Sequence, residues 1–187
     1  MKNEFEIRGK LLNINSVLKF FNKNAQKLKE VHQVDTYFDN KHSSFITDIN
    51  HINNWLRIRE EDNIITLNYK HWLPEGAEIK TYCRENELTI QSKEEMTDIL
   101  IGLGFHQLVE VDKFRRSFKY KDCEISIDRV KNLGEYIEIE YYGDLNNPKT
   151  INNYLQSILN DINAEIRELD HKGYAYHLIH LKLNHAN

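Results

Sequence analysis

Most of the chain consists of short segments in which polar and apolar residues alternate. Residues 3–12, for example, carry charged side chains at alternate positions and mainly apolar ones between them. A period of two is typical of a β-strand with one polar and one apolar face. The segments with this pattern are residues 3–12, 33–39, 55–60, 64–70, 80–90, 111–121, 123–130 and 134–142. About eight strands exceed the 4–6 of an ordinary sheet, which favours closure into a barrel.

Helical periodicity appears four times. The segments are residues 15–30, the residues after Ser92, those after Asn147-Pro148, and residues 172–183. Ser92 and Glu95 have the spacing of a capping box, and Gly104 is placed to end that helix, whose predicted inward residues are Met96, Ile99, Leu100 and Leu103. Because the strands do not alternate one for one with helices, the pattern predicts an α+β fold, with about four helices flanking an eight-stranded antiparallel closed barrel.

Composition narrows the class of protein. The 187 residues fit one domain over residues 1–187, and their net charge of −4 argues against a domain that grips nucleic acid. The sequence contains no long apolar run and no secretory signal, so we expect a soluble, cytoplasmic protein. Cys83 and Cys123 form neither a zinc pattern nor a disulfide framework, and we expect two reduced thiols.

Charged doublets of one sign recur at a spacing of two residues. They are Glu4/Glu6, Arg57/Arg59, Glu85/Glu87, Lys113/Arg115 and Glu138/Glu140. This spacing places both members on one face of a strand, about 6–7 Å apart. A sheet with one solvated face explains each doublet taken singly. Together, however, rows of one sign suit an extended multivalent ligand, with Arg and Lys on phosphate oxygens and carboxylates on a divalent metal ion.

At these residues the sequence resembles the CYTH family, also called triphosphate tunnel metalloenzymes. EFEIR at Glu4 to Arg8 resembles the family's ExExK signature, with Arg8 where lysine is usual. Further matches are DTYFD at 35–39, LRIRE at 56–60, LNYK ending at Lys70, VDKFRR at 111–116, ISIDRVKNLGEYIEIE at 125–140 and KGYAYHLI at 172–179. Arginine keeps the charge of lysine but is planar and not easily deprotonated, so a role that needs a neutral amine does not transfer to Arg8.

The resemblance implies a barrel with a charged interior that binds a triphosphate together with Mg²⁺ or Mn²⁺. The residues implied to bind phosphate are Arg8, Arg57, Arg59, Lys70, Lys113 and Arg115. Those implied to hold the metal are Glu4, Glu6, Asp128, Glu138 and Glu140, and the catalytic candidates are Glu6, Arg8, Asp128 and Glu138. Glu85, Glu87 and Tyr37 are further candidates for the site.

Two reactions and one non-catalytic function remain open. In class IV adenylyl cyclases the ribose 3′-hydroxyl of ATP attacks the α-phosphate, giving cyclic AMP and pyrophosphate. In the family's triphosphatases, water attacks the terminal phosphoryl of tripolyphosphate or thiamine triphosphate. The third alternative is a module that binds a nucleotide or polyphosphate without turnover. The segments QVDTYFD and KGYAYHLI favour the cyclase branch. The resemblance also implies a homodimer, and the absence of a long apolar run predicts no membrane partner.

Overall fold

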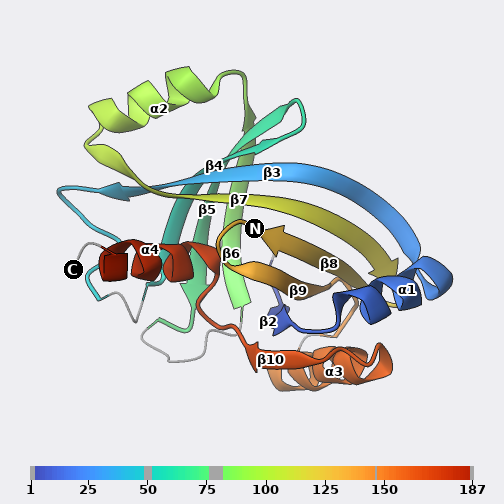
Figure 1. Cartoon of the computed structure of the whole chain (residues 1–187). Helices are drawn as coiled ribbons and strands as arrows, with labels where there is room; N and C mark the ends of the chain where they lie inside the picture. The colour runs from blue at the N-terminus through green and yellow to red at the C-terminus, as the bar shows by residue number, and fades with distance from the viewer. Residues whose placement is uncertain (1–2, 49–51, 76–81, 146, 186–187) are drawn as a thin grey trace. The chain divides into compact units, whose positions relative to one another are not determined.

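The structure is a computed structural model that describes residues 3–48, 52–75, 82–145 and 147–185 (Figure 1). The strands are β1 (Asn3–Glu4), β2 (Glu6–Leu11), β3 (Gln26–Asn40), β4 (Asn54–Glu61), β5 (Ile64–Leu73), β6 (Tyr82–Ile90), β7 (Phe105–Tyr120), β8 (Cys123–Val130), β9 (Gly134–Tyr141) and β10 (Ile166–Leu169). The helices are α1 (Ile14–Asn24), α2 (Lys93–Gly102), α3 (Pro148–Asp161) and α4 (Tyr174–His185). The predicted α+β class is confirmed.

The strand order explains why eight strands were predicted where the described residues form ten. The hydrogen-bonded order is β1-β6-β5-β4-β3-β7-β8-β9-β2-β10. Only Phe5 separates β1 from β2, so these two strands are one amino-terminal segment. Counted in this way, eight strands follow one another and the order returns to the segment on which it began, as the strand order of a closed barrel does. β10 is an added strand on β2.

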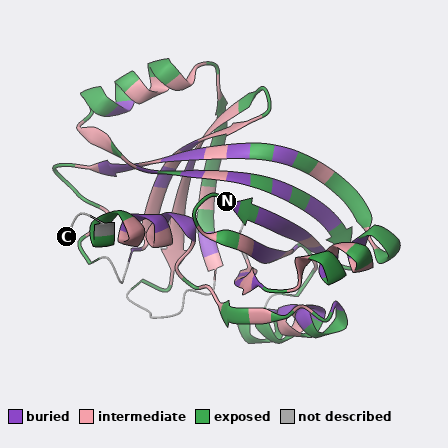
Figure 2. Ribbon diagram, in the orientation of Figure 1, coloured by how far each residue is buried: buried purple, intermediate pink, exposed green. Residues whose placement is uncertain are grey.

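The described residues form two compact units. The first unit consists of Met1–Asn3, His32–Asp112 and Tyr174–Asn187, and the second of Glu4–Val31 and Lys113–Gly173. Burial alternates along β2, whereas β8 and β9 are each buried at four consecutive positions, residues 125–128 and 136–139 (Figure 2). The strand pairs for which a register is defined are antiparallel throughout. The single domain predicted over residues 1–187 stays a prediction.

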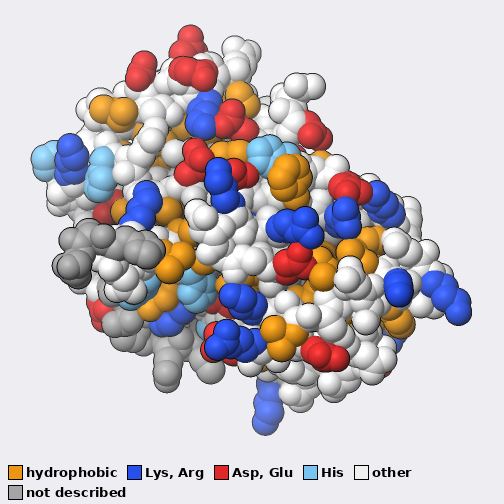
Figure 3. Space-filling view, in the orientation of Figure 1, with side chains coloured by type: hydrophobic (Ala, Val, Ile, Leu, Met, Phe, Trp, Pro, Cys, Tyr) orange, Lys and Arg blue, Asp and Glu red, His pale blue; other side chains and the backbone are white. Residues whose placement is uncertain are grey.

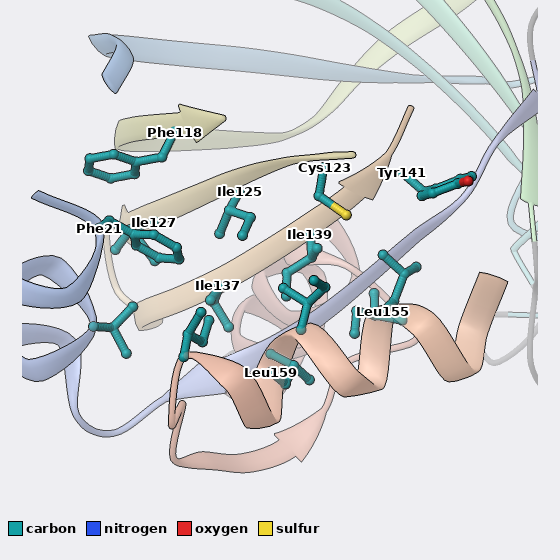
Figure 4. Packing of buried hydrophobic residues seen from close by; sticks show 14 of the residues in the cluster. Phe21, Phe118, Cys123, Ile125, Ile127, Ile137, Ile139, Tyr141, Leu155 and Leu159 are labelled. Carbon is teal, nitrogen blue, oxygen red and sulfur yellow. The ribbon is translucent and has the colours of Figure 1, made fainter. Parts of the chain in front are cut away.

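The second unit has an apolar core between its strands and two helices. Phe21 of α1 stacks on Phe118 of β7, with ring centroids 5.1 Å apart. Leu155 and Leu159 of α3 point toward Ile139 of β9 (Figure 4). The amphipathic spacing predicted for α3 is confirmed, and the side chain of Asn147 caps the helix by accepting from the backbone N of Thr150 at 3.1 Å.

The first unit has a smaller cluster of buried side chains around Phe38, Leu56 and Ile58. The Ser92 cap of α2 is confirmed, since Ser92 Oγ accepts from the backbone N of Glu95 at 3.1 Å. The inward face predicted for α2 is wrong in part. Leu100 is buried and Met96 packs against the cluster, but Ile99 and Leu103 are 54% and 64% exposed. The helix thus contributes one edge rather than a broad stripe to the core.

Several element boundaries differ from the sequence pattern, and β3 and β7 begin at Gln26 and Phe105 rather than at residues 33 and 111. The helix predicted over residues 15–30 ends at Asn24, because Gln26 onward joins the long strand β3 and cross-strand pairing overrides helical periodicity. β10 was not predicted, since four residues are too short to show a period. The last helix occupies Tyr174–His185 rather than 172–183, following Gly173, whose positive φ of +90° suits glycine. In the described part of the chain, no helix combines the length and apolar composition needed to cross a bilayer.

Truncation of the α3 core should destabilise the protein measurably. We expect Leu155→Ala, at a side chain that is 1% exposed, to lower the free energy of unfolding by about 2–5 kcal/mol, because it removes apolar contacts and leaves a cavity. Leu183→Ala on α4, at a side chain that is 51% exposed, is the matched control and should cost less than about 1 kcal/mol. Urea denaturation measures both. Equal effects would mean that α3 does not pack as described.

Candidate functional site

In the first unit, one carboxylate holds two arginines. Asp35 on β3 is 1% exposed and faces Arg59 in register across β3 and β4. Arg59 donates from Nε and Nη2 to the two carboxylate oxygens at 2.6 and 2.7 Å, and Arg57 donates from Nη1 to Asp35 Oδ2 at 3.1 Å. The Arg57/Arg59 doublet is therefore fixed by a two-point fork and a third bond, a pre-organised arrangement for binding an anion.

Arg57 keeps one buried donor unused. Its side chain is 11% exposed, and its Nε has no hydrogen-bond partner in the described part of the chain. Burial alone would lower the pKa of Arg57, but the charge of Asp35 and the hydroxyl of Tyr37 outweigh it and raise the pKa. The guanidinium therefore stays charged at every physiological pH. A buried N–H on a permanent cation favours an anionic oxygen as its acceptor.

The neighbouring strands β5 and β6 bring further predicted residues to the same face. Asn68 on β5 faces Arg57 on one side and Glu87 on the other. Its Nδ2 donates to Glu85 Oε1 and, at 3.3 Å, to Glu87 Oε2. Lys70 Nζ lies 3.7 Å from Glu85 Oε1. Lys70, Glu85, Glu87 and Tyr37 thus share the sheet face of the arginine doublet, and their roles in the site stay predictions.

In the second unit, Asp128 on β8 holds the other basic doublet. Lys113 Nζ donates to Oδ2 at 2.9 Å, and Arg115 donates from Nε to Oδ1 at 2.7 Å and from Nη2 to Oδ2 at 2.6 Å. Asp128 is fully buried. Burial alone would raise the pKa of Asp128, but the charges of Arg115 and Lys113 outweigh it and hold the pKa below its ordinary value. Asp128 thus orients two cations in this structure, whereas its metal-binding role stays a prediction.

Arg8 lies among carboxylates in the second unit. It donates from Nε to Glu138 Oε2 at 2.9 Å and from Nη2 to Glu6 Oε1 at 2.6 Å, and its Nη1 lies 3.9 Å from Asp170 Oδ2. Glu138 also accepts from Arg115 at 2.9 Å. The longer arginine side chain therefore bridges two carboxylates that the resemblance assigns to the metal. The contact with phosphate that the resemblance implies for Arg8 stays a prediction.

The predicted metal ligands lie partly within the described residues. Glu6 and Glu140 are direct partners across β2 and β9, and Glu138 lies two positions from Glu140 on the same face. The side chain of Glu4 lies outside the described residues. Over the described residues, no group of three His, Cys, Asp or Glu side chains lies close enough to hold an ion. The donor set is all oxygen, which suits Mg²⁺ or Mn²⁺, but Glu6 and Glu138 would have to leave Arg8 to bind the ion.

Three polar residues of these clusters were not among the predicted site residues. Asp35 stood at an alternating position of the matched DTYFD segment, so its burial on the polar face could have been inferred. Asn68 preceded Lys70 by two residues and shared its face. Asp170 gave no signal, because its place beside Arg8 depends on the return of the chain after β10.

Two other predictions concern the surface and the thiols. On the face that Figure 3 shows, Lys and Arg side chains are interspersed with Asp and Glu, and the expectation of no nucleic-acid partner stays a prediction. Cys83 and Cys123 are buried free thiols, as expected. Burial raises the pKa of Cys123 to about 12, so its thiol is protonated and unreactive.

Comparison with known proteins finds a matching domain family, a similar sequence and similar structures. A model of the CYTH domain matches residues 2–171. A Methanocaldococcus jannaschii protein, provisionally named an adenylate cyclase, is 31% identical over 173 residues, which cover 91% of this chain and 95% of that protein. A Pyrococcus horikoshii structure has a TM-score of 0.78 at 22% identity, covering 95% of this chain and 99% of its own. A Hippeastrum protein, provisionally an adenylyl cyclase and described as having a dominant triphosphatase activity, has a TM-score of 0.65 at 17% identity, covering 97% and 96%.

Neutralising Asp128 should destabilise the protein, because Lys113 and Arg115 would remain buried without their counter-charge. We expect Asp128→Asn to lower the free energy of unfolding by about 3–5 kcal/mol at pH 7. Since the folded state lowers the pKa of Asp128, its contribution is complete above the ordinary value of about 3.9 and is lost as pH falls through the folded-state pKa.

The difference in stability between Asp128→Asn and the wild type should therefore be constant above about pH 5 and shrink in stronger acid. Urea denaturation across this range measures it. Asp161→Asn, at a side chain 41% exposed and paired with Lys121, is the control and should cost at most about 1 kcal/mol. A difference that does not change with pH would contradict the ionised state of Asp128.

Proposed function

The chain belongs to the CYTH family, and from this premise we propose that it is a divalent-metal-dependent enzyme that converts ATP to cyclic AMP and pyrophosphate. The observation that carries the proposal is the Arg57/Arg59 doublet, held by Asp35 and retaining a buried Nε donor without a partner in the described residues. The 31% identity with a provisionally named adenylate cyclase supports cyclisation as the reaction.

The arginine doublet is proposed to bind phosphoryl oxygens of the triphosphate. Asp35 fixes the positions of both guanidinium groups before the substrate arrives, so little side-chain entropy is lost on binding. The remaining donors of Arg57 and Arg59 supply charge-assisted hydrogen bonds, which are about twice as strong as neutral ones. Lys70 on the same face adds a further positive charge.

The proposed reaction forms a bond between the ribose 3′-oxygen and the α-phosphorus, breaks the bond from that phosphorus to the bridging oxygen of pyrophosphate, and releases the 3′-hydroxyl proton to solvent. Negative charge develops on the leaving pyrophosphate as this bond breaks. Cationic side chains that are already in place stabilise such charge without reorganisation, and in many phosphoryl-transfer enzymes this stabilisation accounts for most of the rate acceleration. Lys113 and Arg115 are proposed to take part, since Asp128 fixes them in the same manner.

Glu6, Glu138 and Glu140 are the residues proposed to hold Mg²⁺ or Mn²⁺. Their carboxylate oxygens suit a hard divalent cation. Such an ion lowers the pKa of an attacking oxygen and offsets the charge of the leaving group. Arg8 donates to Glu6 and Glu138, so its charge offsets the repulsion between these carboxylates and stabilises the folded cluster before an ion binds.

Two incubations with Mg²⁺ or Mn²⁺ test the function. With ATP as the substrate, cyclic AMP and pyrophosphate are measured by mass spectrometry. With tripolyphosphate as the substrate, the release of free phosphate is measured. We expect cyclic AMP with stoichiometric pyrophosphate. The double variant Glu138→Gln, Glu140→Gln should lose metal-dependent turnover by at least about 100-fold, because amides bind a divalent cation weakly.

Glu135→Gln is the matched control, since Glu135 lies on β9 but on the opposite face and pairs with Arg129. It should keep wild-type turnover. Release of phosphate without cyclic AMP would replace the cyclase with a triphosphatase. Binding without any turnover would reduce the protein to a nucleotide-binding module.

Arg8 should compete with the metal for its carboxylates. Arg8→Lys keeps the charge but replaces a guanidinium that reaches both Glu6 and Glu138 with a single ammonium. We therefore expect Mn²⁺ to bind about tenfold more tightly to Arg8→Lys, measured by titration calorimetry without nucleotide. Arg129→Lys, whose side chain is 71% exposed, is the control and should bind as the wild type does. Equal affinity in all three proteins would show that Arg8 does not compete.

A further inference from the structure

The amide of Asn68 is a buried polar group that the proposed chemistry leaves unused. Asn68 is 1% exposed and lies in the middle of β5. Its Oδ1 is buried and accepts no hydrogen bond in the described part of the chain. A buried amide oxygen without a donor loses its hydrogen bonds to water on folding and gains none in return, which destabilises the folded state. Native proteins rarely keep such an atom unless it serves a ligand or an ordered water.

The two glutamates of β6 fix the orientation of this amide. Nδ2 of Asn68 donates to both Glu85 and Glu87. The reversed orientation would place Oδ1 against two carboxylates, which cannot donate when ionised. Because β6 lies on one side of β5 and β4 on the other, Oδ1 is directed away from β6 and toward β4.

Arg57 is the residue of β4 that faces Asn68 in register. Its Nε is likewise buried and has no partner within the described residues. Directly opposed residues of an antiparallel pair have Cβ atoms about 4.5–5.5 Å apart, so a donor and an acceptor, each without a partner, occur on adjacent side chains of one sheet face. A ligand that satisfies both must present an acceptor and a donor close together.

We propose that Asn68 selects triphosphates whose organic group carries a hydroxyl near the phosphoryl oxygens. Arg57 donates to a phosphoryl oxygen, and Asn68 Oδ1 accepts from the hydroxyl, as a ribose could provide. This inference rests on the proposed function, because it assumes that Arg57 binds phosphate. Inorganic tripolyphosphate carries no organic hydroxyl and leaves Oδ1 without a donor. Sites built to hydrogen-bond a hydroxyl discriminate strongly against analogues that lack it.

Calorimetry on the full chain in EDTA tests the selection without turnover. The three ligands are ATP, 2′,3′-dideoxy-ATP and tripolyphosphate. We expect the wild type to bind ATP about tenfold more tightly than dideoxy-ATP, the difference that one buried hydrogen bond contributes. Equal affinity for ATP and dideoxy-ATP would overturn the proposal, as would failure of the wild type to bind ATP, since the hydroxyl is read only when Arg57 holds the phosphate.

Asn68→Leu removes the acceptor while keeping a similar volume. In this variant the tenfold preference for ATP over dideoxy-ATP should disappear, while affinity for tripolyphosphate changes by less than about threefold. Thr66→Val is the matched control. Thr66 lies two residues earlier on the same face and its Oγ1 is 3.5 Å from Glu87 Oε2, so the variant removes a neighbouring hydroxyl without removing the buried acceptor. It should keep the preference.

Different results would contradict the selection by Asn68 and the proposed cyclase reaction. Loss of the preference in Thr66→Val as well as Asn68→Leu would assign it to the glutamates of β6 rather than to Asn68, and would overturn the inference. If Asn68→Leu does not fold, the affinities of the wild type for ATP and dideoxy-ATP still test whether the site recognises the hydroxyl. Turnover is measured separately with metal, so an inactive protein that prefers ATP contradicts only the proposed reaction.

Discussion

The clusters depend on one physical constraint: cations placed on a buried strand face must be paired with carboxylates. Alternation puts Arg57/Arg59 and Lys113/Arg115 on the polar faces of β4 and β7, where the exposed fraction of these side chains is 16% or less. An unpaired charge at such a position would cost several kcal/mol. In each unit, an aspartate on a neighbouring strand pairs with both cations, namely Asp35 on β3 and Asp128 on β8, and Glu138 is a second partner of Arg115.

This repeated design leaves unused capacity for a ligand. An aspartate has two oxygens, and two guanidinium groups carry ten N–H donors between them. Asp35 therefore fixes the positions of Arg57 and Arg59 without saturating either of them, and the Nε of Arg57 remains as a buried donor without a partner in the described residues. A protein optimised for stability alone would place apolar residues here, since well-packed apolar groups often stabilise more than a buried ion pair.

How far the sequence predicts the structure depends on the range of the interactions involved. Period-two alternation identified the strands and the charged doublets, because side-chain direction in a strand is a local property. It failed at residues 26–30, where pairing of β3 with β7 overrides a helical pattern, and at β10, which exists only because Leu11 and Gly9 of β2 offer it an edge. Asp170 was missed for the same reason. The cap at Ser92 was predicted because it spans only four residues.

Arg8 illustrates how one substitution within a familiar motif changes the chemistry of a site. A lysine at this position would offer one nitrogen and could satisfy one carboxylate well. Arginine offers a planar fork, and its Nε and Nη2 reach Glu138 and Glu6 on different strands. The side chain thus joins β2 to β9 electrostatically and occupies oxygens that a metal ion would need. At the proposed metal site, binding of the ion would be coupled to release of Arg8, and the free energy of metal binding would include the cost of separating this ion pair. The freed guanidinium would then be available to phosphate, so the same residue can stabilise the protein before the ion binds and hold the substrate afterwards.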